Sequence, residues 1–206
     1  TTNYKNDRTN LIIGSHANMY AREHKMGIRP FEATDLYSNT GRKNEVSAFV
    51  KLNYTLGSLI PYIDVQYRTV QFEYISDNNT LLEPNSITWS FLNPKVGLSY
   101  NADKHIKLYG FAGTTHREPT RNDMLGGFDD IDSTNYEFVG LLSRVKPETA
   151  YDVEFGMNME YSKFKMDLNF YDMRFRNEIT PIGKLSYIGL PLRKNVEKSY
   201  RRGIEL

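Results

Sequence analysis

The chain has 206 residues, enough for one domain of ordinary size, and its 15 tyrosines and 11 phenylalanines argue against intrinsic disorder. A net charge of +1, from 26 basic and 25 acidic residues, gives no electrostatic footprint for binding nucleic acid. There is no cysteine, which excludes disulfides, thiol catalysis and cysteine-ligated metals.

Several segments carry apolar residues at every second position, the pattern of a strand with one apolar face and one polar face. In chain order the predicted strands are 10–22, 45–56, 61–74, 88–100, 105–116, 149–161, 164–175 and 194–206. No stretch approaches the roughly 18 apolar residues of a membrane helix. A mean hydropathy of −0.57 still allows a membrane barrel, because a barrel strand turns half of its residues away from lipid.

The segment 150–173 gives the clearest hairpin. If Ser162 and Lys163 form the loop, Tyr161 faces Phe164, and the apolar pairs continue upward from there. The same register places Glu160 opposite Lys165 on the other face, so each face is chemically consistent. Because Ser-Lys suits a type I′ turn poorly, a four-residue loop with the same register is an alternative.

The connections between predicted strands alternate strictly between short and long. The short ones are 57–60, 101–104 and 162–163, and the long ones are 23–44, 75–87, 117–148 and 176–193. In an up-and-down sheet this places tight turns at one end and long loops at the other, the polarity of an outer-membrane barrel. Four aromatic residues beside the short turns are candidates for an interfacial girdle: Tyr54, Tyr100, Tyr161 and Phe164.

Strand length favours a membrane barrel over a soluble sandwich. Twelve residues at about 3.3 Å each, tilted by about 45°, rise roughly 28 Å, close to the apolar band of about 25 Å of such barrels. The apolar face would then contact lipid, and the charged face a lumen. A soluble β-sandwich, whose apolar face is a core, is the alternative, and so is a small barrel of eight strands that closes by itself.

Three stretches resemble TonB-dependent outer-membrane receptors. SFLNPKVGLSYNADKHIKLYGFAGTTHREPTRNDM (90–124) is similar to a hairpin of that family, VKPETAYDVEFGMNMEYSKFKMDLNFYDMRFRNEI (145–179) to its next segment, and NVEKSYRRGIEL (195–206) to a later strand. Upstream, YSNTGRKNEVSAFVKLNYTL and YIDVQYRTVQFEY resemble the branch found in Bacteroidetes.

The resemblance implies a large barrel of 22 strands, with a plug domain inside, in the outer membrane of a Gram-negative bacterium. Such receptors import scarce ligands such as ferric siderophores, haem or cobalamin, driven by the TonB complex, and they are not enzymes. Residues 1–206 are then expected to be about eight strands of an antiparallel, up-and-down barrel wall. The plug, the TonB box and the last strands are expected to lie outside this chain.

A cationic group at the base of the longest loop is the candidate ligand site: His116, Arg117 and Arg121. Facing a lumen, these side chains would attract an anionic ligand such as a ferric chelate. Solvated loop residues paired with Glu118 and Asp123 are the simpler interpretation, since the local charge is near neutral.

No other motif indicates chemistry. Asp129, Asp130 and Asp132 lack the spacing of an EF-hand loop, so an acidic loop tip is favoured over a calcium site. The histidines form no HxxxH pair, and no GxSxG, P-loop or GxGxxG motif occurs, so we expect no metal, no cofactor and no catalytic residue.

Three functions therefore compete. A TonB-driven receptor, whose partners would be outer-membrane lipid, the TonB complex and a small-molecule ligand, is favoured. A passive porin-type channel and a soluble or surface-displayed β-sheet binding module are the alternatives. The sequence does not identify the ligand, because loops and plug decide specificity and the charges of the loops here are mixed.

Overall fold

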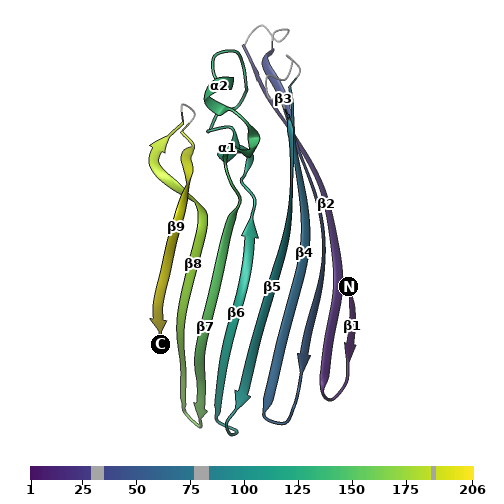
Figure 1. The fold of residues 1–206 in the computed structure, drawn as a ribbon, viewed down its shortest axis with the longest axis vertical. Helices are drawn as coiled ribbons and strands as arrows, with labels where there is room; N and C mark the ends of the chain where they lie inside the picture. The colour runs from purple at the N-terminus through teal and green to yellow at the C-terminus, as the bar shows by residue number, and fades with distance from the viewer. Residues whose placement is uncertain (29–34, 77–83, 187–188) are drawn as a thin grey trace.

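A computed structural model describes residues 1–28, 35–76, 84–186 and 189–206. They form one antiparallel sheet in which every strand pairs with its neighbours in sequence, from β1 to β9 (Figure 1). The strands are β1 (Thr2–Lys5), β2 (Thr9–Gly27), β3 (Asp35–Tyr54), β4 (Leu59–Ser76), β5 (Ser86–Asn101), β6 (Ile106–Arg117), β7 (Glu148–Tyr161), β8 (Phe164–Leu185) and β9 (Pro191–Glu205). The predicted all-β, up-and-down architecture is confirmed.

The strand count and several boundaries differ from the prediction. β1 was not predicted, because TNYK shows no apolar alternation, yet it pairs with Asn10–Ile13 of β2. β3 begins at Asp35 and β8 continues to Leu185, both inside segments predicted as long loops. The predicted connections 23–44 and 176–193 are therefore too long, and parts of three long connections lie outside the described residues.

The predicted β7–β8 register is confirmed at every pair. Tyr161 pairs with Phe164, Phe155 with Phe170, and Glu160 with Lys165. The loop has two residues rather than four, and Ser162 adopts a φ of 44°, a left-handed conformation that the tight turn requires.

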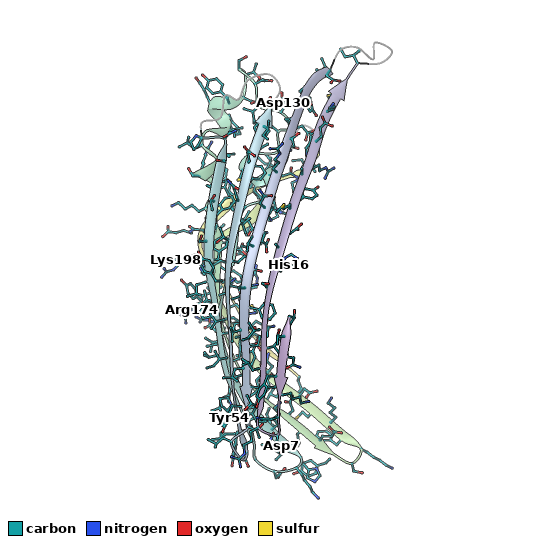
Figure 2. All side chains as sticks on the ribbon, turned by 90° about the vertical axis from the view of Figure 1, so that its right-hand side faces the viewer. Asp7, His16, Tyr54, Asp130, Arg174 and Lys198 are labelled. Carbon is teal, nitrogen blue, oxygen red and sulfur yellow. The ribbon has the colours of Figure 1, made fainter. Side chains whose placement is uncertain are left out.

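Two chemically different faces run along the sheet. The apolar face includes Val50, Val65, Leu98, Val153 and Phe170, which the strand register places on one side of the sheet. Its large side chains are widely exposed; Val153, for example, keeps 55% of its surface. Figure 2 shows the sheet from its side, with side chains projecting along its whole length, Tyr54 near the short-turn end and Asp130 at the opposite end.

The polar face carries charged pairs at matching positions. Lys51 lies beside Asp64 at 3.3 Å, and Asp64 in turn pairs across strands with Lys95. Asn93 donates to Gln66 at 3.1 Å on the same surface. In this part of the sheet, the polar groups of this face therefore bind one another, and the face does not form an apolar core.

Aromatic rings cover glycines on the polar face. Gly156 is paired with Tyr109, and a Cβ added to this glycine would lie 2.5 Å from the Tyr109 ring. Gly14 lies under Phe49 in the same way. Phe49 interrupts the apolar alternation of its strand for this reason: its ring occupies the space that the glycine leaves.

The connection 118–147 folds back onto the sheet at the long-loop end (Figure 1). It contains α1 (Arg121–Met124), α2 (Tyr136–Val139) and the 3₁₀ turn η1 (Leu142–Arg144). Its apolar residues pack on strand residues to form the buried core, whose members are Val70, Phe72, Tyr74, Trp89, Phe91, Met124, Leu125, Ile131, Val139 and Leu142. The core therefore lies at one end of the sheet, on the face that is polar lower down.

Within the described ranges, no helix has the length and apolar character needed to cross a membrane.

Candidate functional site

A cavity of about 240 Å³ opens beside this core, between the upper strands and the start of the connection 118–147. β2 and β3 form one wall, β4 and β5 contribute aromatic rings, and the segment 118–122 closes the side. Its polar lining residues are Tyr20, Arg22, His24, Lys43, Glu118, Thr120, Arg121 and Asn122. We call this the upper pocket.

Glu118 is the buried anion of the upper pocket, with 7% of its surface exposed. Lys43 Nζ lies 2.5 Å from its Oε1, and Arg68 donates to its Oε2. Burial alone would raise the pKa of Glu118, but the hydrogen bond from Lys43 and the charges of Lys43 and Arg68 hold it below its ordinary value. Glu118 is therefore an ionised anchor that ties the long connection to β3 and β4.

Arg121 enters the upper pocket from α1. Its Nη2 donates to Asn39 Oδ1 at 3.0 Å, and it also donates to the carbonyl oxygen of Asp129. Among the described residues, its Nε and Nη1 make no hydrogen bond, although Nη1 lies 3.8 Å from the Asp129 carboxylate. Arg121 therefore ties the connection to Asn39 of β3, and its side chain lines the cavity.

His116 points to the polar face just below the pocket. Its ring stacks on Phe91 with centroids 5.3 Å apart, and its Nδ1 lies 2.9 Å from Asn93 Oδ1. The β5–β6 ladder ends at Lys95 and Gly113, so the backbone N–H of His116 donates to the same amide oxygen instead.

Arg117 contacts β7 rather than the upper pocket. Its Nη2 donates to Glu148 Oε2 at 3.0 Å, and Glu148 also accepts the backbone N–H of Ile179. Of the three candidate residues, Arg121 lines the upper pocket, whereas His116 and Arg117 do not. The expected partner Glu118 bonds to Lys43 and Arg68 rather than to this group, and Asp123 caps α1 through Thr120.

The acidic stretch 129–132 is anchored to the sheet rather than free. Asp130 Oδ1 accepts from Tyr74 at 2.9 Å and from Asn39 at 3.1 Å, and Ile131 between the aspartates is buried. Asp132 accepts from Thr134. In the part of the chain that the structure describes, no three histidine, aspartate or glutamate side chains converge as metal ligands.

Tyr20, Arg22 and His24 were missed as candidate site residues. They alternate along β2 and so share one face, but they lie where the predicted strand was ending. The sequence did contain a pattern that could have indicated them: these three polar or aromatic residues occur at every second position. Its meaning depends on β3, whose Gly41 and Lys43 complete the wall in a segment predicted as loop.

The sequence from residue 2 to residue 206 matches the family model for the TonB-dependent receptor-like β-barrel. The chain belongs to this family. The resemblance inferred from the motifs in 90–206 is therefore confirmed, and the open sheet is a segment of such a barrel wall. The family consists of receptors and transporters rather than enzymes. No curated protein sequence matches the chain significantly.

Solved structures of this family share the fold. The copper transporter OprC superposes with a TM-score of 0.73 at 13% identity, over 98% of this chain and 32% of that one. The FrpB iron transporter from Neisseria meningitidis (F3-3 variant) gives 0.61 at 15%, over 98% and 30%. The ferric-catecholate import receptor Fiu from E. coli K12 gives 0.62 at 9%, over 98% and 33%. The chain thus spans about a third of each of these structures.

Proposed function

We propose that this chain is part of the wall of an outer-membrane receptor that imports a small-molecule ligand with energy from the TonB complex. The apolar face would contact outer-membrane lipid, and the polar face would surround a plug supplied by another part of the protein. Charged residues on the lipid side of a barrel destabilise it. The side chains on this face are apolar between the short turns and the level of Thr69 on β4 and Asp172 on β8, as contact with lipid requires. The continuous apolar face is the observation that carries the proposal.

The upper pocket is the part of this chain that we propose contacts the ligand. It lies at the long-loop end, which faces the cell exterior in such barrels. Arg22, Lys43 and Arg121 contribute three cations, against the single buried carboxylate of Glu118. A pocket with this excess of positive charge favours an anionic ligand.

A ferric siderophore is the ligand that we favour, because many such chelates carry negative charge. The names of similar structures include iron and copper transporters, a ferric-catecholate receptor and a haemophore receptor. Haem and cobalamin are the alternative ligands. His116 and Arg117 remain proposed contributors, acting through the position of the loop that begins beside them.

Uptake of a radiolabelled ferric siderophore tests the function directly. A deletion strain expressing the complete receptor should accumulate iron, and collapse of the proton gradient should abolish the accumulation. Uptake that persists without the gradient would indicate a passive porin-type channel instead. A complete protein that fractionates without detergent would indicate a soluble or surface binding module.

Arg121→Gln tests the ligand site within this experiment. It should weaken siderophore binding by about tenfold, the loss expected from one charge-assisted hydrogen bond of about 1.5 kcal/mol. Arg144→Gln is the matched control, because Arg144 lies in the same connection but contacts Phe138 rather than the upper pocket. Equal binding by wild type and Arg121→Gln would remove the upper pocket from the ligand path while leaving transport itself intact.

A further inference from the structure

On β8 and β9 the apolar face becomes charged at the same level of both strands. Phe170 of β8 pairs with Ile204 of β9, and both side chains are exposed. The next pair on the same face is Asp172 with Arg202. Above it, Arg174 and Arg176 of β8 and Lys198 of β9 continue on this face. We call Arg174, Arg176, Lys198 and Arg202 the outer basic cluster.

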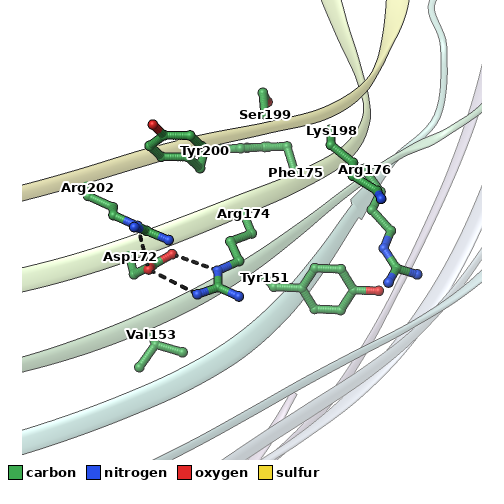
Figure 3. A pocket seen from close by; sticks show the side chains of 10 residues that line it. All are labelled: Tyr151, Val153, Asp172, Arg174, Phe175, Arg176, Lys198, Ser199, Tyr200 and Arg202. Atoms are coloured by element: carbon green, nitrogen blue, oxygen red, sulfur yellow. Dashed lines mark hydrogen bonds and ion pairs between the residues drawn. The ribbon is translucent and has the colours of Figure 1, made fainter.

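The outer basic cluster lines a surface hollow of about 980 Å³ (Figure 3). Asp172 lies within it and binds Arg174 Nε at 3.1 Å and Arg202 Nε at 2.8 Å. The lining of the hollow therefore carries four cations and one carboxylate, which binds two of them. The hollow lies on the face opposite to the upper pocket, since Val153 and Tyr151 of the apolar face form its floor.

Two of the four cations, Arg176 and Lys198, form no ion pair with another described residue. Among the described residues, neither Arg176 nor Lys198 has a carboxylate within ion-pair distance, and the Arg176 guanidinium lies 5.7 Å from the centre of the Tyr151 ring. Arg174 and Arg202 keep 67% and 55% of their side-chain surface exposed. The cluster thus presents several guanidinium donors together with an ammonium group to a ligand.

An apolar groove continues directly below the hollow. It has a volume of about 480 Å³, and its apolar lining residues are Val153, Phe155, Phe170 and Ile204. Asp172 and Arg202 border both cavities, so the two are contiguous. A single molecule with an anionic head and an apolar tail would fill both.

The height of the cluster matches the outer boundary of a bilayer. Phe164 adjoins the short turn, and Asp172 follows it by eight residues, a rise of about 19 Å for a strand tilted by 45°. Arg174 lies at about 23 Å. The apolar band of such barrels is about 25 Å tall, so the cluster lies where lipid headgroups begin on the long-loop side.

We propose that the outer basic cluster and the groove below it bind a phosphorylated lipid of the outer leaflet. Arginine forks hold phosphate oxygens in bidentate fashion, and basic pockets beside membrane-spanning segments bind anionic lipid headgroups. The acyl chains lie in the groove along Phe155 and Ile204. This inference rests on the membrane location in the proposed function, but not on the imported ligand or on the upper pocket.

Native mass spectrometry of the complete receptor in detergent tests the site. The probes are bis-phosphorylated lipid A, the same lipid without phosphates, phosphatidylcholine and inorganic phosphate. Wild type should bind the phosphorylated lipid at least about tenfold more tightly than the dephosphorylated one. Arg176→Gln combined with Lys198→Gln should weaken that binding by about 25-fold, about fivefold for each cation removed, while keeping the ion pairs of Asp172 with Arg174 and Arg202.

Arg42→Gln is the matched control. Arg42 is a cation on the same face at the long-loop end of β3, paired with Glu73 at 3.7 Å and remote from the hollow, and its loss should leave lipid binding unchanged. Equal binding of the phosphorylated and dephosphorylated lipids by wild type would overturn the proposal. So would displacement of the lipid by equimolar inorganic phosphate, which would indicate a site for free anions. Siderophore uptake by the double variant should stay at the wild-type level, which separates this site from the transport function.

Discussion

Tyr74 of β4 donates its phenolic hydrogen to Asp130 across 2.9 Å, and its oxygen accepts the backbone N–H of Ile131 at 3.2 Å. Tyr74 is fully buried, so this one hydroxyl fixes the middle of the connection 118–147 to the sheet. The position of Arg121 at the upper pocket depends on the same stretch, because Arg121 donates to the carbonyl oxygen of Asp129.

Tyr74→Phe should therefore release the connection without changing the strands. Removing the hydroxyl leaves the half-buried Asp130 carboxylate and the buried N–H of Ile131 each short of one partner, a cost of about 1–3 kcal/mol. Hydrogen exchange in the complete receptor should rise across 118–147 and stay unchanged in β7 and β8. Tyr136→Phe is the control, since that hydroxyl is exposed and donates to its sequence neighbour Glu137. Unchanged exchange in 118–147 would show that the apolar core alone holds the loop.

The contact of Glu118 with Lys43 and Arg68 should give the loop a dependence on pH. The pKa of Glu118 is held below its ordinary value of 4.5, so the ionised form stabilises the folded loop. The stabilisation is complete above pH 4.5 and is lost as the pH falls through the lowered folded pKa. Proteolysis of the connection 118–147 by an acid-active protease should therefore accelerate on acidification below pH 4.5.

Glu118→Gln should reproduce the acid effect at neutral pH. The variant leaves the cations of Lys43 and Arg68 without this carboxylate and should cost about 2 kcal/mol, since hydrogen bonds to charged groups contribute about 1.5–3 kcal/mol. Its proteolysis rate should no longer change with pH in that range. A variant that retains the wild-type pH response would assign the response to another carboxylate.

Gly156 should not tolerate a side chain. A Cβ there would lie 2.5 Å from the Tyr109 ring and 2.6 Å from the Leu168 carbonyl oxygen, so Gly156→Ala must displace both. Overpacking of this kind costs about 1–3 kcal/mol, and the thermal unfolding of the complete receptor should shift downward. Gly110→Ala is the control, because its nearest neighbour would be 4.0 Å away. Similar unfolding temperatures for the two variants would mean that Tyr109 moves aside at little cost.

The sequence predicted the lower half of the sheet well because one face there is apolar and the other is polar. The pairs from Tyr161–Phe164 to Phe155–Phe170 follow from that alternation alone. Higher up, in β3 from Asp35 to Asn44, both faces carry polar residues, so the strand has no period of two. Pairing with β2 and β4 creates the strand there, and this pairing is not visible in a local pattern.

Of the residues that line the upper pocket, Arg121 alone was among the candidate ligand residues named from the sequence, for the same reason. His24 lies beyond the predicted end of its strand at residue 22, and Lys43 lies before the predicted start of its strand at residue 45. They line the same pocket as Arg121 because the segment 118–122 lies against both strands. The apolar residues of that connection, such as Leu125 and Val139, indicate in retrospect that it packs on the sheet rather than extending into solvent. His116 and Arg117 lie at the end of β6, where His116 contacts Asn93 and Arg117 binds Glu148.

The contact of the apolar face with lipid is tested most directly by spin labels at single cysteines. Phe155→Cys and Asn158→Cys place labels on opposite faces of β7, and the chain has no cysteine of its own. In the complete receptor in a lipid bilayer, the label at 155 should relax with membrane-dissolved oxygen and be shielded from a water-soluble nickel reagent. The label at 158 should show far less contact with oxygen. A label at 155 that is shielded from both reagents would place the apolar face inside a protein core and contradict the barrel wall described above.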